Sequence, residues 1–411
     1  MIQQPVDNKP RNMAAIKALT FLMFMMFAMT TDSVGLIIPE IVKTFGLSMT
    51  AAGSFQYATM TGIALAGILL GGLADSFARK RTILVGLALF AGSCFLFTTG
   101  NSFLYFSILL ALGGIGIGVF KTSALALIGD LAQSSRQHTA LMNTVEGFFS
   151  VGSIIGPAIL SRLLATGASW KELYILAGSL CVLLILLALR ANYPRHVTSG
   201  LESTSLDLRH TAAAMKDHYA LAFSLGCFLY VATEAAIYVW MPTLLAGYKG
   251  PATLLAAYSI SIFFLLRAAG RFIGAWMLDR LDWTRVLALF SGLIFVCFAG
   301  SIFGGAGAAV YLLPTSGLFM SVIYPSLNSK GISCFPKSEH GAIAGVILFF
   351  TCVSAVIGPL AMGAVSDAMG HPKYGFVLAT GFALLLFLGL FFNWVFDPTR
   401  EHLSRLEATE Y

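Results

Sequence analysis

Five ionisable residues lie deep within long apolar stretches of the sequence: Asp32, Lys121, Glu146, Glu234 and Arg267. A charge in such a setting is costly unless it pairs with an opposite charge or lines a cavity. These residue types fit three kinds of chemistry: proton carriage by a carboxylate, ion pairing, and binding of an anionic or hydroxylated solute. Burial away from cations favours the protonated form of a carboxylate. We therefore predict proton coupling at Asp32, Glu146 and Glu234.

Matched depth predicts two ion pairs among these residues. Lys121 and Glu146 lie at nearly equal distances from the turn between their apolar stretches. A helix rises about 1.5 Å per residue, so both should reach the same depth. Glu234 and Arg267 are matched in the same way. Each pair has two interpretations: a structural pair that fixes helix register, or a pair that takes part in binding or ion coupling.

Polar and aromatic residues within the apolar stretches are further candidates for a binding site. Amide and carboxylate groups can hydrogen-bond the hydroxyls of a sugar, and an aromatic ring can cover its apolar face. A single aromatic residue can equally belong to the membrane interface. The predicted substrate-binding residues are Gln56, Tyr57, Lys121, Asn143, Tyr230, Tyr238, Trp240, Arg267, Tyr324 and Asn328.

The composition identifies the environment of these residues. Of the 411 residues, 57% are hydrophobic and only 11% are charged, whereas a soluble domain has about 25% charged residues. Apolar runs longer than about 18 residues recur along the chain, and such a run can cross a bilayer as a helix. The sequence therefore excludes a soluble globule and a disordered chain. It predicts an all-α integral membrane protein.

Several chemistries lack the residues that they need. The histidines fall in loops or at the ends of apolar runs, and the cysteines form no CxxC pair. The sequence contains no phosphate-binding loop of the G-x-x-x-x-G-K-[ST] type and no nucleophile with a matching base. We expect no enzyme activity, no metal and no cofactor. The net charge of +6 lies in loops, which fits membrane orientation and not nucleic-acid binding.

Twelve apolar runs predict twelve transmembrane helices. Lysine and arginine concentrate in the loops that are cytoplasmic when both termini are inside, as the positive-inside rule requires. The polar stretch 191–218 predicts a cytoplasmic linker between two domains of six helices, 1–190 and 219–411. The predicted spans are 14–39, 50–74, 81–99, 102–129, 138–164, 170–190, 219–246, 252–278, 284–303, 308–329, 340–365 and 373–396.

The two halves of the sequence repeat one another. Gly156-Pro157 in the fifth span recurs as Gly358-Pro359 in the eleventh, and the same interval separates Asp32 from Glu234. The loop at 71–81, GGLADSFARKR, resembles the signature G-x-L-a-D-r-x-G-r-k of major facilitator transporters. This resemblance implies two pseudo-symmetric six-helix bundles with a substrate site between them.

The same resemblance identifies candidate gating residues. The signature loop joins the second and third spans on the cytoplasmic side. A weaker copy begins at Gly270-Arg271-Phe272-Ile273-Gly274 within the eighth span and continues to Asp279-Arg280 after it. We interpret the loop as a gate and conformational latch instead of an ordinary basic loop, and in the resembling family this region is not where substrate binds. The predicted gating residues are Gly71, Asp75, Arg79, Arg271 and Asp279.

Four further motifs resemble the fucose–proton symporter family. Residues 228–234 (FLYVATE) are similar to its FxYVGxE stretch, and 271–274 (RFIG) to its GRFIG. Residues 319–327 (FMSVIYPSL) are similar to its FMSIxYPT, and 143–152 (NTVEGFFSVG) to its N-x-x-Q-x-F-x-S-x-G. The resemblance implies uptake of sugars such as fucose, glucose or galactose, driven by protons or sometimes by sodium.

Three ionisable or polar positions of that family differ here. By the resemblance, its span-one aspartate falls at Gly35, its span-four glutamate at Lys121 and its span-five glutamine at Glu146. Asp32 lies one helical turn before Gly35 on the same face. The proton-site chemistry is therefore expected to be rearranged, and substrate and coupling ion stay open.

The sequence predicts a secondary active transporter that works by alternating access and couples protons to a sugar or similar small polar solute. An organic-anion transporter is one alternative, because Lys121 and Arg267 place two cations at membrane depth. A drug exporter is another, because Gly156-Pro157 resembles the G-x-x-x-G-P motif of proton-driven exporters. A receptor or scaffold would not explain the buried charges. We expect a monomer in a bacterial inner membrane, with the solute, protons or sodium, and the lipid bilayer as partners.

Overall fold

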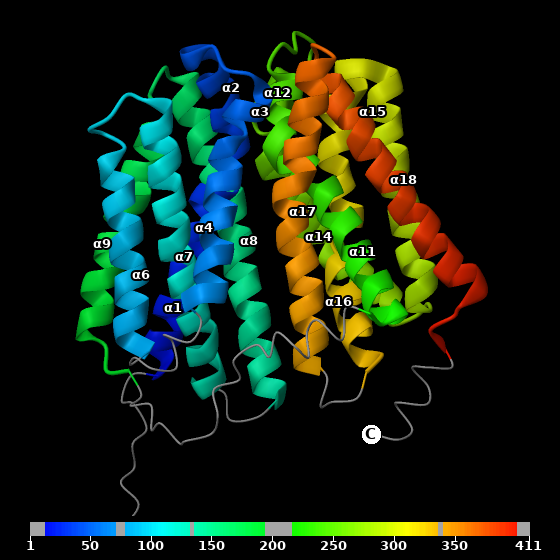
Figure 1. Cartoon of the computed structure of the whole chain (residues 1–411), viewed down its shortest axis with the longest axis horizontal. Helices are drawn as coiled ribbons and strands as arrows, with labels where there is room; N and C mark the ends of the chain where they lie inside the picture. The colour runs from blue at the N-terminus through cyan, green and yellow to red at the C-terminus, as the bar shows by residue number, and fades with distance from the viewer. Residues whose placement is uncertain (1–12, 71–78, 132–134, 194–215, 336–339, 401–411) are drawn as a thin grey trace, which may run out of the picture. The chain divides into compact units, whose positions relative to one another are not determined.

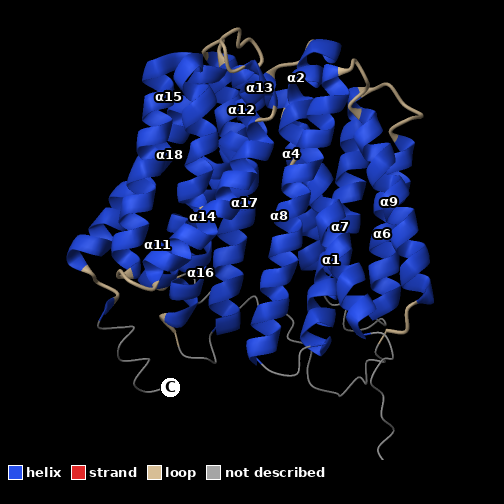
Figure 2. Cartoon of the chain, turned by 180° about the vertical axis from the view of Figure 1, so that it is seen from behind, coloured by secondary structure: helices blue, strands red, loops and turns tan. Residues whose placement is uncertain are grey.

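The computed structural model describes residues 13–70, 79–131, 135–193, 216–335 and 340–400. These ranges contain helices and no strand, as Figure 2 shows. The helices (Figure 1) are α1 (Met13–Thr31), α2 (Val34–Phe45), α3 (Met49–Ala52), α4 (Ser54–Leu70), α6 (Arg79–Leu96), α7 (Phe103–Leu131), α8 (Ser135–Ala165), α9 (Lys171–Arg190), α11 (His218–Ala235), the π-helix η1 (Ala236–Trp240), α12 (Met241–Leu245), α13 (Thr253–Ala257), α14 (Ser259–Leu278), α15 (Trp283–Met320), α16 (Ile323–Ser333), α17 (His340–Ala368) and α18 (Pro372–Phe396).

Nine helices or helix runs within the described ranges are long and apolar enough to cross a membrane. The longest run, Trp283–Ser333, contains the ninth and tenth predicted spans. Gly305 separates them, because its φ of 64° and ψ of −162° are not helical. Helices α4 and α6 lie in the second and third predicted spans. The chain is an all-α integral membrane protein, as the apolar runs predict.

The chain forms two compact units. The first comprises Met1–Asp32 and Ala58–Ser203, and the second comprises Ser33–Tyr57 and Thr204–Tyr411. The second unit thus includes α2 and α3, although both come early in the sequence. The predicted division into two six-helix domains and a linker stays a prediction, and 194–215 of that linker lies outside the described residues.

Helix α1 packs closely against α8 in the first unit. Gly152 faces the carbonyl oxygen of Met25, and Gly156 faces the backbone of Met29, so closely that a Cβ atom at either glycine would collide. Small residues one turn apart allow this approach in membrane helices. Ser153, which lies between the two glycines in sequence, is thereby held beside the end of α1.

Helix α11 packs against α16 and α17 in the second unit, and α14 packs against α15. Gly358 of α17 faces Ala232 of α11. This contact parallels the glycine contact of the first unit, so the Gly-Pro repeat of the sequence is also a repeat in packing. Gly270 of α14 faces the backbone carbonyl of Leu318 in α15. These close contacts fix the helices that carry the charged residues of this unit.

The end of α17 anchors the short helix α3. The Asp367 carboxylate accepts hydrogen bonds from the backbone N–H groups of Met49 (2.7 Å) and Thr50 (2.8 Å). The Ser48 hydroxyl accepts a further bond from the N–H of Ala51 (3.2 Å). The first N–H groups of a helix have no partner within the helix, and a carboxylate there also interacts favourably with the helix dipole. These bonds hold α3 within the second unit.

Candidate functional site

Glu234 and Arg267 form an ion pair in the second unit. The Nη1 atom of Arg267, in α14, lies 2.7 Å from Oε1 of Glu234, near the end of α11. The side chains are 22% and 10% exposed, so either charge alone would be poorly solvated. The contact expected from matched depth is confirmed, and its role in coupling or binding stays a prediction.

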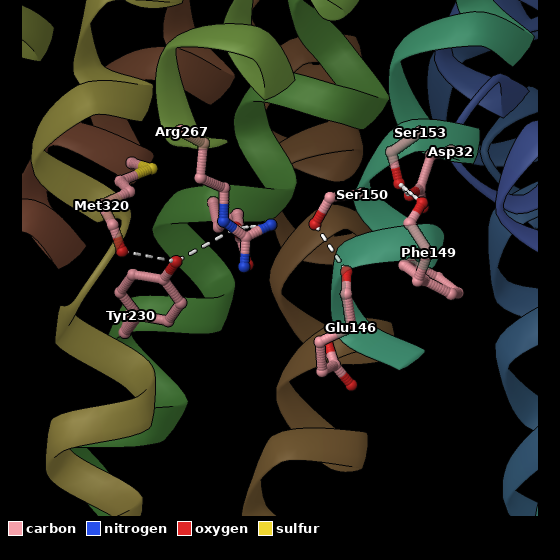
Figure 3. A network of polar contacts seen from close by, with 9 residues as sticks. Asp32, Glu146, Phe149, Ser150, Ser153, Tyr230, Arg267 and Met320 are labelled. Carbon is pink, nitrogen blue, oxygen red and sulfur yellow. Dashed lines mark hydrogen bonds and ion pairs between the residues drawn. The ribbon is translucent and has the colours of Figure 1, made fainter. Parts of the chain in front are cut away.

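Tyr230 lies one turn before Glu234 on the same face of α11. Its hydroxyl oxygen is 3.0 Å from Oε1 of Glu234 and 3.1 Å from the backbone carbonyl oxygen of Met320, the last residue of α15. The side chain is buried. Figure 3 shows the phenol between Met320 and Arg267. The pair is therefore linked through one hydroxyl to the end of α15.

Asp32 follows α1 directly, and its carboxylate accepts a hydrogen bond from the Ser153 hydroxyl of α8 (Figure 3). The Ser153 hydroxyl also lies 3.1 Å from the carbonyl oxygen of Phe149. A hydroxyl has a single proton, which these two oxygens compete to accept. Asp32 is half-buried, and Ser153 is buried. The Thr31 hydroxyl also lies 3.5 Å from Oδ1 of this carboxylate. Hydroxyls from α1 and α8 therefore meet at Asp32.

Lys121 lies beside an aromatic ring. Its ammonium nitrogen is 5.0 Å from the centroid of Phe149. No ion pair joins Lys121 to Glu146 within the described residues. The Glu146 side chain is exposed, and its backbone carbonyl accepts a hydrogen bond from Ser150 (2.8 Å). Equal distance from a turn predicts the depth of a residue along its helix but not the direction in which its side chain points. The predicted contact between Lys121 and Glu146 is therefore absent among the described residues, although their depths were expected to match.

Gln56 and Tyr57 lie near the start of α4, in the second unit. Both amide atoms of Gln56 and the hydroxyl of Tyr57 are buried and have no hydrogen-bond partner among the described residues. Buried polar groups are usually hydrogen-bonded. Both residues therefore remain candidates for binding a polar solute.

The aromatic candidates differ in their surroundings. The ring of Tyr324, in α16, lies 6.0 Å from that of Tyr230 between centroids. The indole N–H of Trp240 donates to the carbonyl oxygen of Pro359 (3.1 Å), which ties η1 to α17. Tyr238 in η1 is half-buried. The structure thus places Tyr324 beside Tyr230 and joins Trp240 to the backbone of α17.

The remaining predicted residues differ in burial, and some fall outside the described residues. Asn328 is half-buried in α16, Arg79 is buried at the start of α6, Arg271 is half-buried in α14, and Asp279 is exposed directly after α14. Gly71 and Asp75 fall outside the described residues, as does the side chain of Asn143.

Three participants were not expected from the sequence: Ser153, the Met320 carbonyl and Asp367. Ser153 could have been found from its place between two glycines at one-turn spacing. Pro325, which lacks an N–H, signals the break after Met320. Asp367 contacts a segment far away in sequence, and no local signal marks it.

A sequence profile of the Major Facilitator Superfamily matches residues 20–359. The chain belongs to this superfamily. The glucose/galactose transporter of Brucella abortus biovar 1 (strain 9-941) is 22% identical over 92% of this chain and 93% of its own. The L-fucose-proton symporter of Escherichia coli (strain K12) is 23% identical over 91% of this chain and 92% of its own. The gallate transporter of Pseudomonas putida is 24% identical over 89% of both chains.

The solved structures agree with the superfamily assignment. The crystal structure of the E. coli fucose:proton symporter aligns with a TM-score of 0.63 and 21% identity, covering 93% of this chain and 99% of that one. At this identity the likeness shows the fold alone. The chain has the major facilitator fold, and the resemblance to the fucose–proton symporter family is confirmed.

Proposed function

We propose that this major facilitator protein is a proton-coupled transporter of a sugar or a similar small polar solute and works by alternating access. The observation that carries the proposal is the largely buried ion pair of Glu234 and Arg267, whose carboxylate also accepts a hydrogen bond from the Tyr230 hydroxyl. Buried ionisable groups in membrane helices typically mark substrate or proton pathways. Relatives named as transporters of glucose, galactose and L-fucose support the substrate class.

The cluster has the groups that sugar recognition needs. The Glu234 carboxylate accepts hydrogen bonds from hydroxyls, and the Arg267 guanidinium donates them. The half-buried ring of Tyr324 lies beside the buried ring of Tyr230, so Tyr324 can offer an apolar face. Gln56, elsewhere in the same unit, has a buried amide without a hydrogen-bond partner among the described residues.

Asp32 is the second proposed proton site. Its carboxylate is held by Ser153 between α1 and α8, which are the helices that pack through Gly152 and Gly156. Protonation would convert this carboxylate from a pure acceptor to a group that can also donate. Asp32 and Glu234 together would supply one proton-binding carboxylate in each unit. Glu146, which is exposed, is the weaker candidate.

Uptake by the purified protein in liposomes tests the proposal. An inwardly directed proton gradient should drive accumulation of at least one of radiolabelled L-fucose, D-glucose and D-galactose, and a protonophore should abolish it. Replacing the proton gradient with a sodium gradient tests the other coupling ion. Glu234→Gln should bind sugar weakly and not accumulate it. Absence of gradient-driven movement of all three sugars, in either direction, would contradict the proposal.

An organic anion is the second candidate substrate. Lys121 and Arg267 supply cations, and one relative is named as a gallate transporter. Gallate in the same liposome assay separates the two candidates. Gallate uptake that is lost in Arg267→Gln, without uptake of any of the three sugars, would favour the anion.

A further inference from the structure

The Tyr230 hydroxyl has one proton to donate and lies within hydrogen-bond distance of two acceptor oxygens. Its oxygen lies 3.0 Å from Oε1 of Glu234 and 3.1 Å from the carbonyl oxygen of Met320. A phenol donates one full hydrogen bond. The two acceptors therefore compete, and the better acceptor at a given moment takes the proton.

The two acceptors belong to different parts of the unit. Glu234 lies near the end of α11, whereas Met320 ends α15. Ser321 and Val322 separate α15 from α16, and Pro325 in the first turn of α16 has no N–H to donate. The Met320 carbonyl thus marks a break between two helices, where its hydrogen bonding affects how α16 is held.

The charge on Glu234 decides the competition. An ionised carboxylate is a much stronger acceptor than a neutral carbonyl. A protonated carboxyl group is a weaker acceptor and has a proton of its own to donate. Tyr230 keeps its proton in both states, and only the acceptor changes.

We propose that Tyr230 is a positioning residue that transmits the protonation state of Glu234 to the break between α15 and α16. The inference rests on the proposed function, in which Glu234 takes up a proton. With Glu234 ionised, the hydroxyl donates to the carboxylate and leaves the Met320 carbonyl. With Glu234 neutral, it donates to Met320 and holds the start of α16.

The other ionisable groups near α11 do not replace Tyr230 as the link between Glu234 and Met320. Arg267 of α14 contacts the same carboxylate oxygen, and Arg271 of α14 acts electrostatically on Tyr230. The neighbouring helices α16, α17 and α18 also contain ionisable residues within the described ranges. Those with described side chains are Tyr324, whose ring lies beside Tyr230, Lys330, Cys352, Asp367, Lys373 and Tyr374, and η1 adds Tyr238. Within the described residues, the groups that contact the Glu234 carboxylate are Arg267 and Tyr230.

A cysteine reporter on α16 tests the inference without any substrate. Ser329 is exposed in α16, so Ser329→Cys can be labelled with a maleimide in the purified protein. Each labelling rate is divided by that of the same cysteine in the unfolded chain at the same pH, which removes the titration of the thiol. This ratio should change about threefold or more between mildly acidic and mildly alkaline pH, as expected for a shift between two populated states.

Three substitutions in this background separate the roles. Tyr230→Phe retains the buried ring and removes the hydroxyl, so the change with pH should disappear. Glu234→Gln should also abolish the change with pH and keep the labelling ratio near the value that the wild-type protein shows at acidic pH. Tyr174→Phe is the matched control, because its phenol is equally buried and its hydroxyl has no hydrogen-bond partner among the described residues. The control should retain the full change.

The outcomes distinguish the inference from the proposed function. Loss of the change in Glu234→Gln but not in Tyr230→Phe would overturn the role of Tyr230 and leave Glu234 as the proton site. If the labelling ratio of Glu234→Gln still changes with pH, Glu234 is not the proton site. Both the inference and the proposed role of Glu234 would then be overturned. A wild-type ratio that does not vary with pH would also overturn the inference.

Discussion

Glu234 and Arg267 lie on different helices, α11 and α14, and their charged groups meet at 2.7 Å. The contact places a carboxylate and a guanidinium among buried side chains of a membrane protein. Such a pair is weak support for stability alone, because both charges lose hydration. The further hydrogen bond from Tyr230 makes the arrangement a connected network. Its chemistry, not its contribution to stability, supports the functional proposal.

Removing one partner of this pair should destabilise the protein more than removing both. Arg267→Met leaves the Glu234 charge uncompensated, at a cost of about 3–5 kcal/mol if the carboxylate stays ionised. The double variant Glu234→Leu/Arg267→Met should recover most of that stability but no gradient-driven uptake. Thermal unfolding and uptake on the same preparations check this. A stable and active Arg267→Met protein would show that the pair is dispensable.

Asp32→Asn should retain the exchange of sugar across the membrane and lose the coupling of sugar movement to protons. The amide retains the ability to accept from Ser153 but cannot bind a proton. We expect exchange of labelled for unlabelled sugar across the membrane to continue and accumulation driven by a proton gradient to be lost. Ser153→Ala removes a hydrogen bond to a carboxylate, worth about 1.5–3 kcal/mol, and should lower the unfolding temperature. Gradient-driven accumulation by Asp32→Asn at the wild-type level would exclude Asp32 as a proton site.

Gly156→Ala should destabilise the packing of α1 on α8. A Cβ atom at this position collides with the backbone of Met29, which cannot move aside as a side-chain end can. We expect a loss of about 1–3 kcal/mol, as in overpacked cores. Gly147→Ala in the same helix is the control, because its new Cβ has no atom within 4 Å besides the adjacent residues and backbone of its own helix. Equal unfolding temperatures for the two variants would contradict the packing described for α1 and α8.

Asp367→Ala should loosen α3 from the second unit. It removes the acceptor for the N–H groups of Met49 and Thr50, and loss of a helix cap costs about 0.5–2 kcal/mol. Asp367→Asn retains one acceptor oxygen and should show an intermediate effect. Hydrogen exchange of the peptide that contains α3 measures the change. Unaltered exchange in Asp367→Ala would show that the cap does not hold the segment.

The sequence predicts the helices well because a bilayer-spanning helix needs a long apolar run, and such runs are visible without an alignment. It also predicts the contact of Glu234 with Arg267, since both depth and rotation bring these two side chains together. For Lys121 and Glu146 the same depth argument fails: Lys121 lies beside the ring of Phe149, and the Glu146 side chain is exposed.

Contacts between distant segments account for what the sequence does not predict. Asp32 meets Ser153 because Gly152 and Gly156 allow α1 and α8 to approach, and Asp367 meets Met49 across most of the chain. The Met320 carbonyl is a backbone group, and no residue type identifies it. Such groups become visible only when helix packing is known.

Sugar-induced proton currents test the proposed function most directly. The purified protein in liposomes adsorbed on a sensor electrode is exposed to a rapid step of L-fucose, D-glucose or D-galactose with no sodium present. Wild-type protein should give an electrogenic current for at least one sugar, and the current should be abolished by Glu234→Gln but not by the control Gly147→Ala. A current that Glu234→Gln leaves unchanged, or no current with any of the sugars, would contradict proton-coupled sugar transport through the Glu234–Arg267 site.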